Sequence, residues 1–196
     1  MGGTVKTVDE LVAFSAQIEG QGIEDHQNCT YTRPELAALA AALLKLPERA
    51  CTVEIGVYAG RSASLSLQLQ PDRQLDIHLI DNWAWRAEIA TQTFSRLIID
   101  HFIEVPFTLH RMRSDYLGPQ WNLPIDFLHV DGWHDMPGVE PDCQLWLPWV
   151  RPGGIAAFHD SFDPAVAICI EKYVKETGWT LIGEAGRTTA WEKPHA

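Results

Sequence analysis

Short β-rich runs alternate with helical segments along most of this chain. The β-rich runs cover residues 52–57, 75–80, 107–112, 125–130 and 155–158. The helical segments between and after them cover residues 61–69, 86–101, 139–150 and 165–176. Strands separated by helices form right-handed βαβ units, so the alternation predicts a parallel sheet with helices on both faces.

The C-terminal end departs from this alternation. Residues 179–183 and 188–192 both have the pattern of strands, and only residues 184–187 separate them. A connection this short permits an antiparallel hairpin but no crossover helix. Residues 151–154 read Arg-Pro-Gly-Gly, a strong stop signal, so we expect the helix over residues 139–150 to end there.

Residues 1–50 precede the first β-rich run. They predict, in order, an amphipathic helix over residues 7–18, a polar loop over residues 20–31 and a helix over residues 32–46. Thr32 and Glu35 have the spacing of a capping box at the start of the second helix. We expect this part to form a helical cap or lid on a core of residues 51–196, the two making a single domain overall.

The chain is acidic. It carries 26 Asp and Glu residues against 15 Lys and Arg residues, a formal net charge of −11 over 196 residues. Nucleic acids and anionic membranes require basic surfaces, so this balance argues against both as partners. The longest uncharged apolar run, residues 36–44, is too short to span a bilayer.

The cysteines and the N-terminus bear on the compartment. Cys29, Cys51, Cys143 and Cys169 show no C-x-x-C spacing, which is typical of reduced thiols in a core. The N-terminal residues lack the apolar segment of a secretory signal. We therefore expect a cytoplasmic protein.

The first β-rich run leads into a loop that contains two glycines. Gly56 lies at the end of the run and Gly60 where the next helix begins, at the edge where open α/β sheets bind ligands. A dinucleotide fingerprint needs glycines at the positions that Tyr58 and Arg61 hold here. Because a glycine at the Tyr58 position lets a pyrophosphate approach the backbone, the tyrosine argues against NAD and FAD and favours a nucleoside without a diphosphate. The alternative is a tight strand–helix turn with no ligand.

Polar residues also end the second and third runs. Asp81 is placed to accept hydrogen bonds from both hydroxyls of a ribose. The alternative is a helix cap formed by Asp81 or Asn82. Ser114 and Asp115 follow the third run, where they could read an adenine amino group or where Asp115 could simply cap a turn.

The fourth and fifth runs end in carboxylates and imidazoles. Asp131 and His134 follow the fourth run, and His159 and Asp160 follow the fifth. Neighbouring strands lie about 4.8 Å apart, so these side chains can converge above the sheet edge. They suit a divalent cation such as Mg²⁺, Mn²⁺ or Fe²⁺, and without a metal they supply a general base. The alternative is that His159 and Asp160 brace the loop while His134 is solvated.

Over about residues 52–192, the chain resembles the class I S-adenosylmethionine-dependent methyltransferases. The resemblance rests on the order of elements, the first glycine loop, Asp81, the Pro-Gly-Gly turn and the terminal hairpin. Within this class, Val-Asp-Gly-Trp-His at residues 130–134 and His-Asp-Ser at residues 159–161 are similar to methyltransferase family 24. The resemblance implies a Rossmann-like, doubly wound α/β sheet of seven strands in the order 3-2-1-4-5-7-6, with strand 7 antiparallel and helices on both faces.

The same resemblance implies S-adenosylmethionine as the cofactor. It implies methionine contacts near Glu54 and Gly56, ribose contacts at Asp81, and adenine contacts near Ser114 and Asp115. The predicted cofactor-binding residues are Glu54, Gly56, Tyr58, Gly60, Ser62, Asp81, Asn82, Ser114, Asp115 and Asp131.

Some relatives also bind Mg²⁺ through carboxylates at the ends of strands 4 and 5, the positions of Asp131 and Asp160 here. We therefore predict a Mg²⁺ or Mn²⁺ site at Asp131 and Asp160, with His134 or, alternatively, His159 as a third ligand. Two residues depart from the catechol-type pattern. Ser161 stands where that type has Asn, and His134 is additional.

The sequence thus predicts a methyltransferase that acts on a small molecule at oxygen, with His134, His159 and Asp131 as catalytic residues. It predicts no nucleic-acid or membrane partner and leaves a homodimer open. Two other classes remain: a metal-dependent hydrolase or oxygenase built on the same Asp and His residues, and a catalytically silent module that binds the adenosyl ligand.

Two sets of residues are candidates for the acceptor side. The polar loop before the first long helix, with His26, Gln27 and Tyr31, is either a lid over the acceptor or a plain surface loop. Three tryptophans follow strand ends and either line the acceptor or adenine pocket or only pack: Trp83, Trp85 and Trp133.

Overall fold

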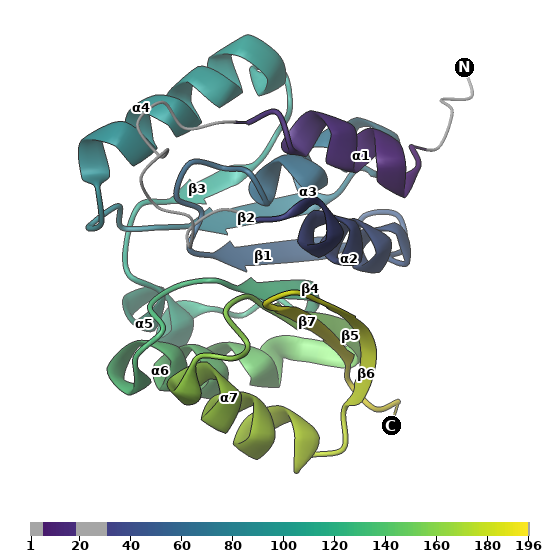
Figure 1. The fold of residues 1–196 in the computed structure, drawn as a ribbon, viewed down its shortest axis with the longest axis vertical. Helices are drawn as coiled ribbons and strands as arrows, with labels where there is room; N and C mark the ends of the chain where they lie inside the picture. Colours follow the sequence, from purple (N-terminus) through teal and green to yellow (C-terminus); the bar gives the residue numbers. More distant parts are fainter. Residues whose placement is uncertain (1–5, 19–30, 196) are drawn as a thin grey trace.

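The structure is a computed structural model, and it describes residues 6–18 and 31–195. Within these residues a seven-stranded mixed sheet forms the centre of the molecule (Figure 1). Its strands are β1 (Cys51–Ile55), β2 (Asp76–Ile80), β3 (Thr108–His110), β4 (Ile125–Val130), β5 (Val150–Phe158), β6 (Thr180–Ala185) and β7 (Thr188–Glu192). Their order in the sheet is β3-β2-β1-β4-β5-β7-β6, and β7 runs antiparallel to both of its neighbours. The predicted fold class and strand order are confirmed.

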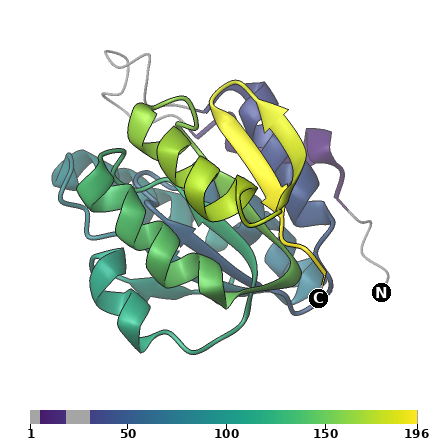
Figure 2. The same ribbon diagram turned by 90° about the horizontal axis from the view of Figure 1, so that it is seen from below.

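Helices cover both faces of the sheet, as Figures 1 and 2 show. One face carries α1 (Val8–Ser15), α2 (Arg33–Leu44), α3 (Ala63–Arg73) and α4 (Ala87–Leu97). The other carries α5 (Ser114–Leu117), α6 (Met136–Trp146) and α7 (Pro164–Ile170). Two π-helical turns, Ile98–Phe102 and Glu171–Lys175, extend α4 and α7.

The sheet separates two apolar cores. Side chains alternate along a strand, so Phe127 of β4 packs with α1 to α4 whereas Leu128 packs with α6 and α7. All of β1 is buried, as expected for a central parallel strand that is covered on both faces.

The predicted capping box at the start of α2 is present. Glu35 Oε2 accepts a hydrogen bond from the Thr32 backbone N–H at 2.7 Å, and Thr32 Oγ1 accepts one from the Glu35 N–H at 3.4 Å. Glu35 is buried, and its other oxygen accepts a bond from the Arg187 N–H at 2.7 Å. A residue read from sequence as a local helix cap therefore also fastens α2 to the turn between β6 and β7.

The Arg-Pro-Gly-Gly segment lies inside a strand, which corrects the expected boundary. Helix α6 ends at Trp146, a 3₁₀ turn covers Leu147–Trp149, and β5 begins at Val150. The register with β4 shifts across this segment, because Ile125 pairs with Val150 and Phe127 pairs with Ile155. The extra residues bulge, and two backbone hydrogen bonds tie the bulge to Lys193, from Gly153 N to Lys193 O and from Lys193 N to Gly154 O.

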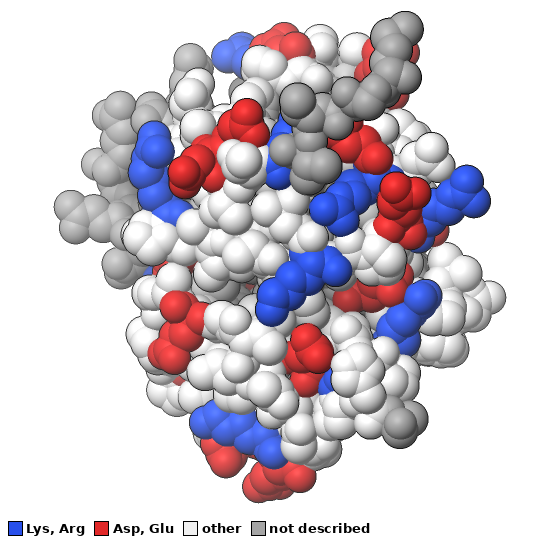
Figure 3. All heavy atoms as spheres, turned by 90° about the vertical axis from the view of Figure 1, so that its right-hand side faces the viewer, with Lys and Arg blue, Asp and Glu red and all other residues white. Residues whose placement is uncertain are grey.

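The surface in Figure 3 carries charges of both signs, and the described cysteines are free thiols. On the face drawn in Figure 3, acidic and basic side chains are interspersed and neither sign forms a continuous patch. Among the described residues, no helix has the length and apolar character needed to cross a membrane. Cys51, Cys143 and Cys169 are all free and buried, as predicted, whereas Cys29 lies outside the described residues.

Candidate active site

A cavity of about 720 Å³ opens at the carboxyl edge of the central strands. It lies where β1 and β4 are neighbours and the order of connections reverses, the usual ligand position in an open α/β sheet. The predicted site residues that line it are Gly56, Tyr58, Asp81, Asn82, Ser114, Asp115, Asp131, His134, His159 and Asp160. Glu54, Gly60 and Ser62 do not line it.

Gly56 has a packing reason to be glycine. Its φ is +88°, and a Cβ there would lie 1.9 Å from the carbonyl oxygen of Asp131. The loop after β1 is held against β4 at this point, since Asp131 N donates to Ile55 O at 2.8 Å. Only a residue without a side chain allows this approach, so Gly56 fixes the distance between two loops that line the cavity.

The three predicted residues that do not line the cavity make buried contacts that support the loop after β1. Glu54 is buried, and its Oε1 accepts a hydrogen bond from Ser62 Oγ at 2.6 Å. Gly60 has a φ of +86°, and a Cβ there would meet Leu97 and Phe94 at 2.8 Å. The glycine loop that the sequence suggested as a ligand contact is therefore, in part, a structural support.

Asp81 is held rigidly at the end of β2. Its Oδ2 accepts from the Tyr58 backbone N–H at 2.8 Å, and its Oδ1 accepts from the Trp83 N–H at 2.6 Å. The N-cap of α4 is Arg86, so neither Asp81 nor Asn82 caps that helix. A carboxylate can accept about four hydrogen bonds, so Asp81 retains acceptor capacity on the cavity wall.

Ser114 and Asp115 lie at the start of the short helix α5, which the sequence did not predict. Asp115 is paired with Arg113 at 2.7 Å. Ser114 Oγ donates to Oδ1 of Asp142 in α6 at 2.5 Å. Asp142 lines the cavity, and burial raises the pKa of its carboxyl to about 7.

The sequence interpretation did not include Asp142, although a signal was present. Val139, Asp142, Cys143 and Trp146 follow one another at helical spacing, and all four are buried. A carboxyl group on the apolar face of a helix needs a partner, which here is Ser114.

The carboxylates and imidazoles after β4 and β5 converge as predicted. His134 Nε2 lies 2.8 Å from Asp160 Oδ2, and His159 Nδ1 lies 3.1 Å from Asp131 Oδ1. Asp131, His134 and Asp160 each offer a donor atom within 4.8 Å of the others. Arg187, whose role the sequence did not reveal, brings a guanidinium to 2.5 Å from Asp160 Oδ1.

The two histidines of this cluster are in different environments. His159 is buried, and although burial opposes its charge, Asp131 and Asp160 outweigh that effect and raise its pKa to about 10. His134 is 40% exposed at its side chain, and its hydrogen bond to Asp160 raises its pKa. The pKa of Asp160 is lowered, because its hydrogen bonds to His134 and His159 outweigh burial. His159 is therefore a fixed cation at neutral pH, whereas His134 faces the cavity.

Four of the six candidate acceptor-side residues fall within the described part of the chain. His26 and Gln27 lie outside it, but Tyr31 is buried and donates from its hydroxyl to Asp131 Oδ2 at 2.6 Å. Trp83 is a packing residue, because its ring is buried and its Nε1 donates to Tyr58 O at 2.9 Å. The other two tryptophans line the cavity and are exposed: Trp85 and Trp133.

Comparisons with known proteins agree with this arrangement. A family model described as a methyltransferase domain, that of methyltransferase family 24, matches residues 53–161. The O-methyltransferase NovP is 12% identical, with a TM-score of 0.70 and coverage of 96% of this chain and 100% of that one. The O-methyltransferase TomG from Streptomyces achromogenes, involved in tomaymycin synthesis and solved with S-adenosylmethionine, is 22% identical, with a TM-score of 0.61 and coverage of 96% and 92%. An rRNA methylase from Streptococcus thermophilus is 16% identical, with a TM-score of 0.61 and coverage of 85% and 100%. At these identities the solved structures establish a shared fold.

Proposed function

Because this chain belongs to methyltransferase family 24, within the class I S-adenosylmethionine-dependent methyltransferases, we propose that it methylates a small-molecule acceptor at oxygen. The observation that carries the proposal is that two residues of complementary chemistry line the same cavity. Asp81 lies on its wall at the end of β2, and His134 lies on the same cavity after β4. The first suits a nucleoside ligand and the second suits removal of a proton from an acceptor hydroxyl.

The cavity residues fit S-adenosylmethionine by their donors and acceptors. The fixed carboxylate of Asp81 suits the two ribose hydroxyls, and the paired side chains of Ser114 and Asp142 suit the polar edge of adenine. A volume of about 720 Å³ is within the usual range of about 300–1,000 Å³ for small-molecule sites. When bound, this cofactor supplies an electrophilic methyl group.

His134 is the residue that we propose accepts the proton of the acceptor hydroxyl. Its imidazole is exposed to the cavity, and Asp160 orients it at 2.8 Å. His159 has a different role, because it is buried and charged between Asp131 and Asp160. It holds both carboxylates in place and is a positioning residue.

A divalent metal at Asp131, His134 and Asp160 is the second route for proton removal. The spacing of their donor atoms within 4.8 Å favours it. The local charge opposes it, because Asp160 already contacts Arg187 at 2.5 Å and Asp131 contacts His159 at 3.1 Å. A divalent ion here would lie beside two cationic groups, so we propose that the metal-independent route operates.

The acceptor class follows from charge and from the aromatic residues of the cavity. Trp85 and Trp133 offer exposed rings to an aromatic or sugar-like molecule. A net charge of −11 opposes an RNA acceptor such as the one named for the rRNA methylase.

We also propose that residues 1–50 form a cap over the core. Two hydrogen bonds support this, from the Tyr31 hydroxyl to Asp131 and from the Arg187 N–H to Glu35.

Calorimetric titration with S-adenosylhomocysteine and, separately, with NAD tests the cofactor assignment. We expect S-adenosylhomocysteine to bind and NAD not to bind. Asp81→Asn, which keeps the shape of the side chain, should weaken binding by about 1–3 kcal/mol because ribose hydroxyls lose their acceptor. Asp100→Asn, an exposed residue after α4, is the matched control and should bind like the unmodified chain.

Two outcomes would contradict this proposal. If Asp81→Asn bound S-adenosylhomocysteine with unchanged affinity, Asp81 would not be the ribose ligand. If the chain bound NAD, the argument that Tyr58 excludes a diphosphate would be wrong. Turnover is then measured with labelled S-adenosylmethionine and a panel of phenols and sugars, with and without EDTA. Activity that disappears in EDTA and returns with Mn²⁺ would favour the metal route, and binding without any turnover would favour the silent module.

A further inference from the structure

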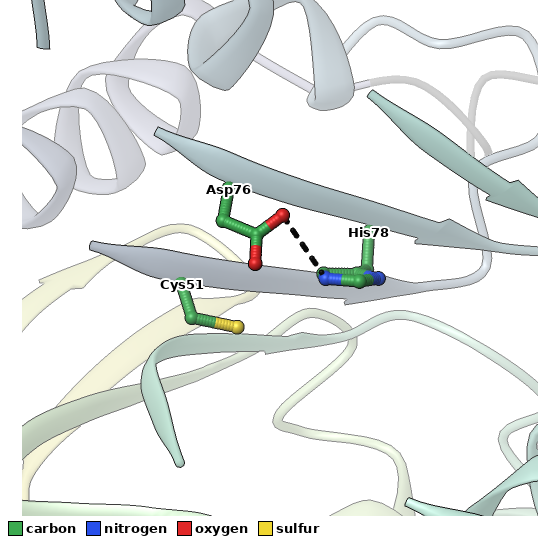
Figure 4. A group of neighbouring side chains, drawn as sticks. All are labelled: Cys51, Asp76 and His78. Atoms are coloured by element: carbon green, nitrogen blue, oxygen red, sulfur yellow. Dashed lines mark ion pairs between the residues drawn. The ribbon is translucent and has the colours of Figure 1, made fainter. Parts of the chain in front are cut away.

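A second cluster of metal-ligating side chains lies at the amino-terminal edge of the sheet, opposite the cavity. Cys51 begins β1 and Asp76 begins β2, and these two residues are paired in the parallel register. His78 lies two residues after Asp76, so both side chains project from the same face of β2. Figure 4 shows the Asp76 carboxylate and the His78 ring side by side, with the sulfur of Cys51 on the neighbouring strand.

The three donor atoms are close enough to share one cation. His78 Nε2 lies 3.3 Å from Asp76 Oδ1, and the three residues each offer a donor atom within 4.8 Å of the others. Around a tetrahedral zinc ion, with bonds of about 2.0–2.3 Å, donor atoms are separated by about 3.3–3.8 Å. The observed spacing therefore requires only small side-chain movements to close around an ion.

The Nε2 atom of His78 is a buried polar atom without a hydrogen bond among the described residues. The residue is only 8% exposed, and its approach to Asp76 does not have hydrogen-bond geometry. Buried polar atoms in native proteins nearly always have a partner, so this nitrogen indicates a missing one. It points into the space that Cys51 and Asp76 border, which is the position a metal ion would take.

The other nitrogen of His78 is already fixed. His78 Nδ1 lies 3.1 Å from His110 Nε2, and the edge of the Trp121 ring packs against the imidazole with centroids 4.8 Å apart. A ligating histidine usually donates its second N–H to an acceptor, which orients the ring and leaves the first nitrogen free to bind metal. His110 Nε2 accepts such a bond when the His110 proton is on Nδ1 and the His78 proton is on Nδ1.

We propose that Cys51, Asp76 and His78 bind one zinc ion at the starts of β1 and β2, with water as the fourth ligand. A sulfur, an imidazole nitrogen and a carboxylate oxygen form a donor set that zinc accepts and that Mg²⁺ and Ca²⁺ do not favour. The Asp76 side chain is 57% exposed, so the ion has a route from solvent and the fourth position faces water. None of the three residues lines the cavity, and the site does not depend on the proposed methyl transfer.

Cobalt titration of the full chain tests this site directly. The protein is freed of metal by chelator dialysis and titrated with Co²⁺, and zinc is then added as competitor. We expect one equivalent of Co²⁺ to produce a thiolate-to-cobalt charge-transfer band, and zinc to abolish it. Cys51→Ser should remove the band, whereas Cys143→Ser, Cys29→Ser and Asp160→Asn should retain it.

Two further variants keep the test decisive if Cys51→Ser fails to fold. Asp76→Asn alters an exposed side chain and should weaken zinc binding at least tenfold, whereas Asp72→Asn, an exposed residue at the end of α3, should not. His110→Gln should weaken binding about 10–100-fold, the usual effect of losing the residue that orients a ligating histidine. No band in the unmodified chain, a band that persists in Cys51→Ser, or equal zinc affinities for Asp76→Asn and Asp72→Asn would overturn the proposal.

Discussion

His134 and His159 lie in one cluster and contact the same aspartate, yet their surroundings give them different chemistry. His159 is 5% exposed and lies between Asp131 and Asp160, with Glu35 3.9 Å from its other nitrogen. Three carboxylates therefore stabilise its cationic form. His134 has 40% of its side chain exposed, so a substrate hydroxyl can reach it. At the residue scale, exposure separates the proton acceptor from the positioning cation.

His134→Ala should lower the turnover rate by about 10²-fold or more, since this is the usual size of a general-base contribution. The affinity for S-adenosylhomocysteine should not change. His195→Ala, which removes an exposed histidine near the C-terminus, is the control and should keep full activity. Single-turnover kinetics and calorimetry on the same samples check both parts.

The pH profile of the same reaction gives an independent readout. Asp160 raises the pKa of His134 above the ordinary value of about 6.5, and only the neutral imidazole accepts a proton. The rate should therefore rise with pH through a midpoint above about 6.5, and His134→Ala should lose this rise. A rise that is unchanged in His134→Ala and absent in His159→Gln would assign the base to β5.

The loop after β1 is the element that joins the two halves of the cavity. Gly56 contacts Asp131 just after β4, and Tyr58 N donates a hydrogen bond to Asp81 just after β2. Gly60 packs against α4. Two of these contacts need a left-handed backbone with no side chain, at Gly56 and Gly60. The conformation of this element is thus set by packing as well as by any ligand.

Gly56→Ala should destabilise the fold by about 2–4 kcal/mol, from overpacking against Asp131 together with left-handed backbone strain. Gly183→Ala is the matched control, because a Cβ there would lie 3.8 Å from Ala190, an ordinary contact. Urea denaturation of the two variants gives the comparison. Equal stabilities would mean that the loop relaxes freely and that Gly56 is not a packing requirement.

Asp142 makes the stability of the whole molecule depend on pH. Burial raises its pKa to about 7 in the folded state, against about 3.9 in an unfolded chain. The folded state therefore prefers the protonated carboxyl, and the stabilisation is complete below about pH 4 and is lost as the pH rises to about 7. This contribution is at most roughly 4 kcal/mol, which is what the difference between the folded and unfolded pKa values amounts to.

Asp142→Asn keeps a neutral side chain at every pH, so it should remove this loss. We expect the free energy of unfolding to fall less between pH 5 and pH 8 in Asp142→Asn than in the unmodified chain, when urea denaturation is measured without ligand. Asp72→Asn is the exposed control and should retain the full pH dependence. An identical pH dependence in Asp142→Asn would show that the buried carboxyl is not the cause.

The sequence by itself determined the features that depend only on residues close to one another along the chain. The periodicity of hydrophobic residues predicted the strands and most helices. The capping box at Thr32 and Glu35 predicted the start of α2. Polar residues at the ends of β2, β4 and β5 gave Asp81, Asp131 and Asp160, because parallel strands all end at one edge. The predicted end of α6 is wrong, because proline and glycine occur both at helix ends and in strand bulges, and here they form a bulge in β5.

Only the tertiary structure decided which of these residues work together. Glu35 and Arg187 are 152 residues apart in sequence, Tyr31 and Asp131 are 100 apart, and no periodic pattern links such pairs. The same holds for Ser114 with Asp142, and for Cys51 with the start of β2. A local pattern reports the conformation of a segment, whereas pKa, burial and ligand geometry depend on groups that the fold brings from elsewhere. The partners of Asp142, Asp160 and His78 therefore had to come from the fold.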